Sequence, residues 1–246
     1  MRRTLVVLAG LALVAPLLAT LPAATASATA AEPDTPAFSL WAPQQVTAYA
    51  YRNRTWTDLG LRVVAEGAPF ELWSSRASYD DPVETVWRSP DGDVPLPAGS
   101  MSTFSGLTRF LKITIDPSRQ GEEDVTLIRK GCLNGYSERV RPDAPARSPY
   151  PVGCWYNPYS LGSVQGIQTG WATPVLTQNH PLRIGPGRYT VTVSIRRAYA
   201  EAFGLTAEQA TRTTRLTVVT EGDGVAEPGV AGRHPVRPAP HRPTGT

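Results

Sequence analysis

The stretch that decides the fold is Arg188-Tyr-Thr-Val-Thr-Val-Ser-Ile195, in which apolar and polar side chains alternate with a period of two. Pro186 and Gly187 precede it as turn residues. This alternation is typical of a β-strand with one buried and one solvated face. We therefore expect the chain around it to be built from strands.

Strand signals recur at short intervals on the N-terminal side, and once more near the C-terminus. The further predicted strands are 46–51, 59–65, 70–79, 83–88, 110–115, 124–129 and 213–220. The fifth and sixth of these are expected to pair across the polar turn 117–123. About eight short strands with turn-rich connections predict an all-β fold, an immunoglobulin-like antiparallel β-sandwich over residues 40–220.

Helical signals are confined to the segment between the last two predicted strands. Arg197 to Phe203 could form two turns before Gly204, and Thr206 is a candidate N-cap for residues 207–210. We expect a short helical insertion at the sandwich edge, before the last strand.

The two ends of the chain differ from the centre. Residues 1–30 combine Arg2 and Arg3, an uncharged apolar run and an alanine-rich stretch, which predicts a secretory signal peptide and an extracellular protein with no membrane anchor after cleavage. The alternative is an uncut anchor, but the run is short for a membrane span and contains prolines. Residues 31–39 are expected to be a flexible lead-in, and the Gly- and Pro-rich residues 221–246 a disordered tail.

Net charge gives no reason to expect a nucleic-acid partner. The whole chain carries a formal charge of +3, which falls to about +1 once Arg2 and Arg3 leave with the signal peptide. The basic pI therefore reflects mostly the predicted signal.

Cys132 and Cys154 are the two cysteines of the chain. Outside the cytoplasm such a pair most simply forms one disulfide, here closing a 21-residue, proline-rich loop. Closing a loop of this length stabilises a fold by about 3 kcal/mol in the chain-entropy model. Redox or metal chemistry is the alternative, but there is no Cys-x-x-Cys motif and no nearby histidine.

Residues for catalysis are scarce. The three histidines are His180, His234 and His241, so a charge-relay triad would depend on His180 alone. Carboxylates cluster at 80–81, 91–93 and 122–124, where turns are expected; we interpret them as solvated, with weak calcium binding as the alternative. We expect no catalytic residue, no metal site and no cofactor.

Aromatic side chains give the best binding signal. Trp155, Tyr156 and Tyr159 follow Cys154 closely, and Tyr136 and Arg139 lie on the same segment. Rings on a rigid loop can stack on a sugar or bury into a protein partner, so a cell-wall glycan or an extracellular protein is the expected ligand. In the alternative, which the sequence favours, Trp155 and Tyr156 pack over the sheet and anchor the loop. The remaining tryptophans, Trp41, Trp56, Trp73, Trp87 and Trp171, are interpreted as core or edge packing.

Several stretches resemble the N-terminal, non-catalytic region of actinobacterial secreted lysyl-oxidase-like proteins. They are Leu40-Trp-Ala-Pro43, Val46-Thr-Ala-Tyr49, Asp58-Leu-Gly-Leu-Arg62, Gly67-Ala-Pro-Phe-Glu71, Arg76-Ala-Ser-Tyr-Asp80, Arg141-Pro-Asp-Ala-Pro145, Ser148-Pro-Tyr-Pro151, Asn157-Pro-Tyr159, Gly166-Ile-Gln168, Gly170-Trp171 and Pro186-Gly-Arg-Tyr-Thr-Val-Thr-Val193 with the insertion 199–204. The few lysines and many arginines also suggest a GC-rich genome.

The resemblance implies an accessory role. In that family this region precedes a separate copper-dependent amine oxidase domain, whose histidine-rich motif has no counterpart here. The first hypothesis is therefore a secreted binding or scaffolding module, and the second an accessory domain of a protein-lysine oxidase whose catalytic domain is missing or encoded separately. A hydrolase that uses the acidic clusters is the third.

Overall fold

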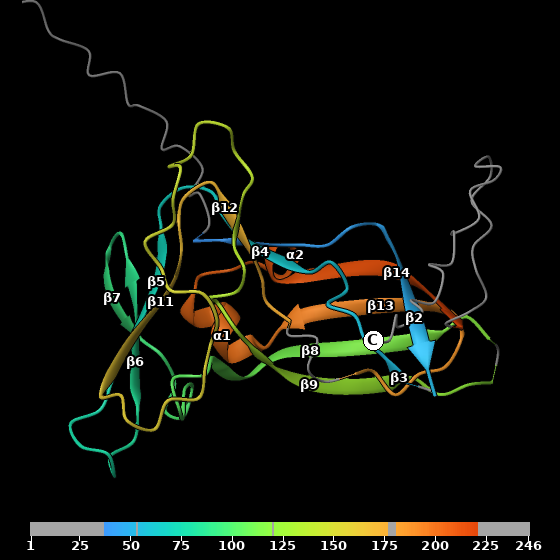
Figure 1. The fold of residues 1–246 in the computed structure, drawn as a ribbon, viewed down its shortest axis with the longest axis horizontal. Helices are drawn as coiled ribbons and strands as arrows, with labels where there is room; N and C mark the ends of the chain where they lie inside the picture. The colour runs from blue at the N-terminus through green and yellow to red at the C-terminus, as the bar shows by residue number, and fades with distance from the viewer. Residues whose placement is uncertain (1–36, 53, 120, 177–180, 221–246) are drawn as a thin grey trace, which may run out of the picture. The chain divides into compact units, whose positions relative to one another are not determined.

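The computed structural model describes residues 37–52, 54–119, 121–176 and 181–220 (Figure 1). Within this part of the chain there are fourteen strands and two short helices. They are β1 (Ser39–Trp41), β2 (Gln45–Tyr51), β3 (Arg54–Thr55), β4 (Arg62–Ala65), β5 (Phe70–Ser75), β6 (Glu84–Ser89), β7 (Gly92–Pro95), β8 (Leu107–Pro117), β9 (Val125–Gly131), β10 (Glu138–Arg139), β11 (Gly162–Ile167), β12 (Trp171–Pro174), β13 (Gly187–Ile195), α1 (Arg197–Ala202), α2 (Ala207–Ala210) and β14 (Thr211–Thr220).

The predicted strand 188–195 lies inside the largest sheet, as part of β13. This sheet has the order β3-β2-β14-β13-β8-β9, so β13 is hydrogen-bonded on both sides. Val191 is opposite Thr214 on β14 and opposite Ile115 on β8. Val191, Val193 and Ile195 are buried, which confirms the alternation read from the sequence. The predicted pairing of 110–115 with 124–129 is also confirmed, as β8 with β9.

The remaining strands form two smaller sheets, with the orders β1-β4-β12-β10 and β11-β5-β6-β7. The all-β class is thus confirmed. The immunoglobulin-like sandwich is not confirmed, because the strands form three sheets rather than two, and β2 runs parallel to β14.

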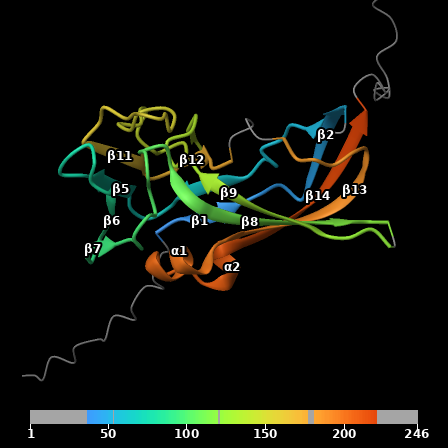
Figure 2. The same ribbon diagram turned by 90° about the horizontal axis from the view of Figure 1, so that it is seen from below.

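Both helices lie where the sequence placed them, between β13 and β14. Thr206 caps α2: its hydroxyl accepts from the backbone N–H of Gln209, and the Gln209 side chain accepts from the backbone N–H of Thr206. In Figures 1 and 2, both helices lie beside one end of the largest sheet, the end nearer to β5 and β6.

A cluster of aromatic rings joins the sheets to this helical segment. Phe203, just after α1, contacts Phe38, Phe70 of β5 and Trp87 of β6 at ring-centroid distances of 5.5, 5.2 and 5.6 Å. Phe38 is completely buried and Ser39 already belongs to β1, so ordered structure begins inside the predicted lead-in 31–39.

The predicted signal peptide 1–30 and the predicted tail 221–246 lie outside the described residues, and so does His180. In the part of the chain that is described, no helix is long and apolar enough to cross a membrane.

Candidate functional site

The predicted disulfide is present. Cys132 and Cys154 are bonded, with their Cα atoms 5.7 Å apart. Cys132 is buried directly after β9, and its backbone N–H donates to the carbonyl of Val175 at 3.2 Å. The bond therefore ties the segment 132–159, here called the aromatic loop, to the end of the largest sheet.

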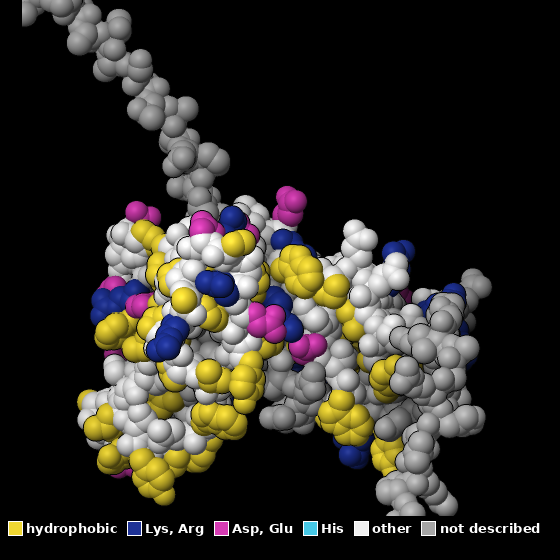
Figure 3. All heavy atoms as spheres, turned by 45° about the horizontal axis from the view of Figure 1, so that its top comes forward, with side chains coloured by type: hydrophobic (Ala, Val, Ile, Leu, Met, Phe, Trp, Pro, Cys, Tyr) yellow, Lys and Arg dark blue, Asp and Glu magenta, His cyan; other side chains and the backbone are white. Residues whose placement is uncertain are grey.

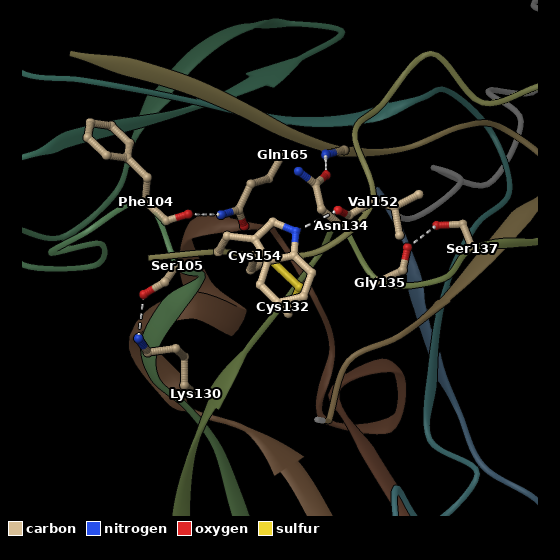
Figure 4. The surroundings of a disulfide bond; sticks show 12 residues. Phe104, Ser105, Lys130, Cys132, Asn134, Gly135, Ser137, Val152, Cys154 and Gln165 are labelled. Atoms are coloured by element: carbon tan, nitrogen blue, oxygen red, sulfur yellow. Dashed lines mark hydrogen bonds between the residues drawn. A yellow bond between two sulfur atoms is a disulfide. The ribbon is translucent and has the colours of Figure 1, made fainter. Parts of the chain in front are cut away.

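Asn134 fastens the same end of the loop to β11. Its Oδ1 accepts from the backbone N–H of Gly166 at 2.7 Å, and its Nδ2 donates to the carbonyl of Val164 at 3.3 Å. Its own carbonyl accepts from the N–H of Gly153. Asn134 is buried and points toward the strand that carries Gln165 (Figure 4). A buried amide whose oxygen and nitrogen both have partners fixes the backbone on either side of it.

Tyr150 fastens the middle of the loop. Its hydroxyl donates to Oε1 of Glu71 on β5 at 2.6 Å. Its ring lies so close to Gly166 that a Cβ there would be 2.5 Å from ring atom Cε1, so this site requires glycine. Burial, and secondarily the hydrogen bond to the Glu71 carboxylate, raises the pKa of Tyr150 well above its ordinary value.

Two further side chains hold the proline-rich part and the C-terminal end. Trp171 donates through Nε1 to the carbonyl of Pro145 at 3.0 Å. Arg76 donates through Nη2 to the carbonyl of Pro158 at 2.6 Å and through Nε to that of Ser160 at 3.0 Å. The guanidinium of Arg76 also lies over the ring of Tyr79, 5.3 Å from its centroid. The aromatic loop is thus attached along its length as well as at the disulfide.

Four aromatic rings of this loop face solvent. The exposed fractions are 72% for Trp155, 68% for Tyr156, 85% for Tyr159 and 76% for Tyr136. The expectation that Trp155 and Tyr156 pack over the sheet is therefore wrong. Tyr150, Asn134, Trp171 and Arg76 anchor the loop instead. Figure 3 shows hydrophobic side chains gathered at the lower left of the face in view.

Trp155 borders a shallow hollow of about 210 Å³. The lining residues are Phe104, Asn134, Pro151, Val152, Gly153, Trp155, Asn157, Ser160, Gly162 and Ser163. The indole Nε1 donates to the carbonyl of Val152 at 3.1 Å, and the ring lies against Gly153, so its orientation is fixed although it is exposed. Among the described residues the hollow combines one broad apolar ring with amide and hydroxyl groups and contains no charged side chain.

The other predicted site residues are not gathered at this hollow. Tyr156 and Tyr159 flank it in sequence but do not line it. Arg139 is exposed in β10, opposite Trp171 of β12, and Tyr136 lies just before β10. Of the scattered tryptophans, Trp87 and Trp171 pack against the core, whereas Trp41, Trp56 and Trp73 are exposed.

The acidic clusters lie on the surface, as expected, although Asp93 belongs to β7 rather than to a turn. All five carboxylates of Asp80, Asp81, Glu122, Glu123 and Asp124 are exposed, and Asp93 forms an ion pair with Arg88. Within the described ranges, no group of three or more His, Cys, Asp or Glu residues could hold a metal ion.

Comparison with known proteins found no match to any family model, curated protein or solved structure. The resemblance to lysyl-oxidase-like proteins therefore has no support beyond the residues that suggested it.

Proposed function

We propose that this chain is a secreted, non-catalytic module that binds a glycan through the aromatic loop. One observation carries the proposal: Trp155 is 72% exposed, yet hydrogen bonds hold its ring and its loop in place at the rim of an uncharged hollow lined by apolar and polar groups. Exposing a large apolar ring to water is unfavourable, and a rigid exposed ring is a common sign of a binding surface.

The chemistry of the hollow favours a sugar. A pyranose offers an apolar C–H face to an indole and hydroxyl groups to amides and hydroxyls. Here Trp155 supplies the face, and Asn157, Ser160 and Ser163 supply polar groups at the same rim. Since the loop is already fixed by the disulfide and by Tyr150, little conformational entropy is lost when a ligand binds.

Secretion belongs to the same proposal, and a disulfide is compatible with an oxidising compartment. The proposal requires a rigid β framework and does not depend on immunoglobulin-like connectivity. The role as an oxidase accessory domain is a separate proposal, which rests on the sequence resemblance alone.

The test is a binding screen of the purified protein on a glycan array and on insoluble cell-wall preparations, followed by calorimetry with the best ligand. Trp155→Ala is expected to weaken binding about 10-fold or more, because truncating an aromatic hot-spot contact costs about 1.4 kcal/mol or more. Trp155→Phe should retain part of the affinity.

The matched control is Trp41→Ala, which removes another exposed tryptophan that does not line the hollow. It should bind as the wild type does. If Trp155→Ala bound every glycan as tightly as the wild type, with unchanged thermal stability, the aromatic loop would not be the glycan-binding site.

A further inference from the structure

A second hollow lies where opposite edges of the largest sheet meet. β3 and β9 are the two outermost strands of this sheet, yet residues from both line one hollow of about 490 Å³. The sheet must therefore curl so that its edges face each other. The lining residues are Arg54, Ile128, Arg129, Lys130, Pro181 and Arg183, and we call this hollow the basic seam.

On one edge, the backbone holds two arginines as neighbours. Thr55 and Leu182 form an antiparallel bridge, with N–H to carbonyl distances of 2.9 and 2.8 Å in the two directions. Both of these side chains are buried, so the adjoining Arg54 and Arg183 lie opposite each other on the outer face, where both are exposed. Like charges directly opposite each other on neighbouring strands destabilise a sheet.

The other edge adds two more basic residues, whose side chains donate to neutral acceptors. Lys130 donates through Nζ to the hydroxyl of Ser105 at 2.7 Å (Figure 4), and Arg129 donates through Nη1 to the carbonyl of Ile128 at 3.3 Å. Both acceptors are neutral.

None of the four cations forms an ion pair with a described carboxylate. Other arginines do form such pairs in the described chain, namely Arg62, Arg88, Arg119, Arg141 and Arg197. The seam is thus a local concentration of positive charge in a chain whose predicted mature form is almost neutral.

We propose that the basic seam binds a multivalent oxyanion, the phosphate or sulfate ester groups of a small anion or of a polymer. The planar fork of an arginine matches the oxygens of such groups and binds them with paired hydrogen bonds. An anion between the two edges would neutralise the opposed Arg54 and Arg183 and would link them to one cation of β9, because Arg129 and Lys130 are consecutive in an extended strand and their side chains point to opposite faces. This site is separate from the hollow beside Trp155, because the two share no lining residue.

The experiment measures the thermal midpoint and the binding heat of the purified protein with pyrophosphate, long-chain polyphosphate and dextran sulfate, each against sodium chloride at the same ionic strength. A ligand that binds only the folded state raises the midpoint, by about 5 °C or more at a hundredfold excess over Kd for a domain of this size. Arg54→Ala with Arg183→Ala is expected to lose most of this shift and at least about 10-fold in affinity. The variant with Arg54→Lys and Arg183→Lys should keep part of the midpoint shift and part of the affinity.

The control is Arg147→Ala with Arg215→Ala, which removes two exposed arginines that do not line the seam. It should respond as the wild type does. A response to pyrophosphate assigns the seam to a small anion, and a response to the polymers alone assigns it to a phosphorylated or sulfated chain. An equal shift with sodium chloride, or unchanged affinity in the Arg54 and Arg183 double variant, would overturn the proposal. Trp155→Ala should leave anion binding intact, which separates this test from that of glycan binding.

Discussion

At the residue scale, Glu71 links a sheet to the loop that it supports. Its Oε1 accepts from the Tyr150 hydroxyl at 2.6 Å and its Oε2 accepts from Trp73 Nε1 at 2.9 Å. Both carboxylate oxygens therefore have a donor, one from the loop and one from β5 itself. Such a shared carboxylate fixes the tyrosine more firmly than a single contact with a neutral acceptor would.

The raised pKa of Tyr150 predicts how stability changes with pH. Below about pH 10 the phenol is protonated in both the folded and the unfolded chain, and its full contribution to the free energy of unfolding is present. As the pH rises above about 10, the unfolded chain loses the proton while the folded chain keeps it, so the free energy of unfolding falls. Urea unfolding of the wild type from about pH 8 to pH 11 should show this fall.

Tyr150→Phe should make the alkaline fall shallower and should cost about 1 kcal/mol at neutral pH through the lost hydrogen bond. Glu71→Gln, which removes the negative charge but keeps an acceptor, should give an intermediate slope. Tyr189, whose pKa is also raised by burial, keeps part of the slope in both variants. Identical alkaline slopes in all three proteins would show that Tyr150 ionises as freely in the folded chain as in the unfolded one.

The sequence could not identify these anchoring residues, because their partners are distant along the chain. Tyr150 is 79 residues from Glu71, and Arg76 is 82 residues from Pro158. Nothing local distinguishes Tyr150 from Tyr156, although one is fixed against Gly166 and the other faces solvent. The sequence did indicate the disulfide and the aromatic content of the loop, because both depend on residue type alone.

At the scale of elements, most of the strands that the sequence predicted alternate between buried and exposed side chains, although β6 and β9 do not. β2, β8, β13 and β14 each bury every second residue over much of their length. The strands that were missed are β1, β3, β7, β10, β11 and β12. Most of these have only two to four residues, and β11 has glycine at 162 and 166 and a buried Gln165, which reads as a loop.

The disulfide belongs to this scale, because it constrains one segment. Replacing Cys132 and Cys154 together by serine is expected to lower the free energy of unfolding by about 3 kcal/mol, measured by urea titration. Hydrogen exchange should quicken for amides of residues 133–153, while those of β13, at the centre of the largest sheet, keep their relative order of protection.

Reduction of the wild-type protein provides the control for the serine substitutions. It should reproduce the faster exchange of the same loop amides without changing any side chain other than the two cysteines. Unchanged exchange in the loop after both treatments would mean that Asn134, Tyr150 and Trp171 hold it without the covalent bond.

At the scale of the whole molecule, a net charge near zero can hide a local cluster of like charges. The net charge read from the sequence gave no reason to expect an anionic ligand, and it could not show the basic seam. Arg54, Lys130 and Arg183 are distant in sequence and meet only because the sheet curls. The same holds for the core, where Phe38, Phe70 and Phe203 come from three different regions of the chain.

This shared core predicts that the described unit unfolds as one. Phe203 contacts Phe38, Phe70 and Trp87, so its truncation affects two sheets and the helical segment at once. Phe203→Ala should cost about 3–5 kcal/mol, a large fraction of the stability of an ordinary domain. Because that variant could fail to fold, Phe203→Leu, with an expected cost of about 1–2 kcal/mol, is the second measurement.

Tryptophan fluorescence, which includes Trp87 in this cluster, and far-ultraviolet circular dichroism should report the same lowered midpoint in urea. If fluorescence shifted while circular dichroism kept the wild-type midpoint, the sheet of β5 and β6 would unfold separately from the largest sheet, and the core would not be shared.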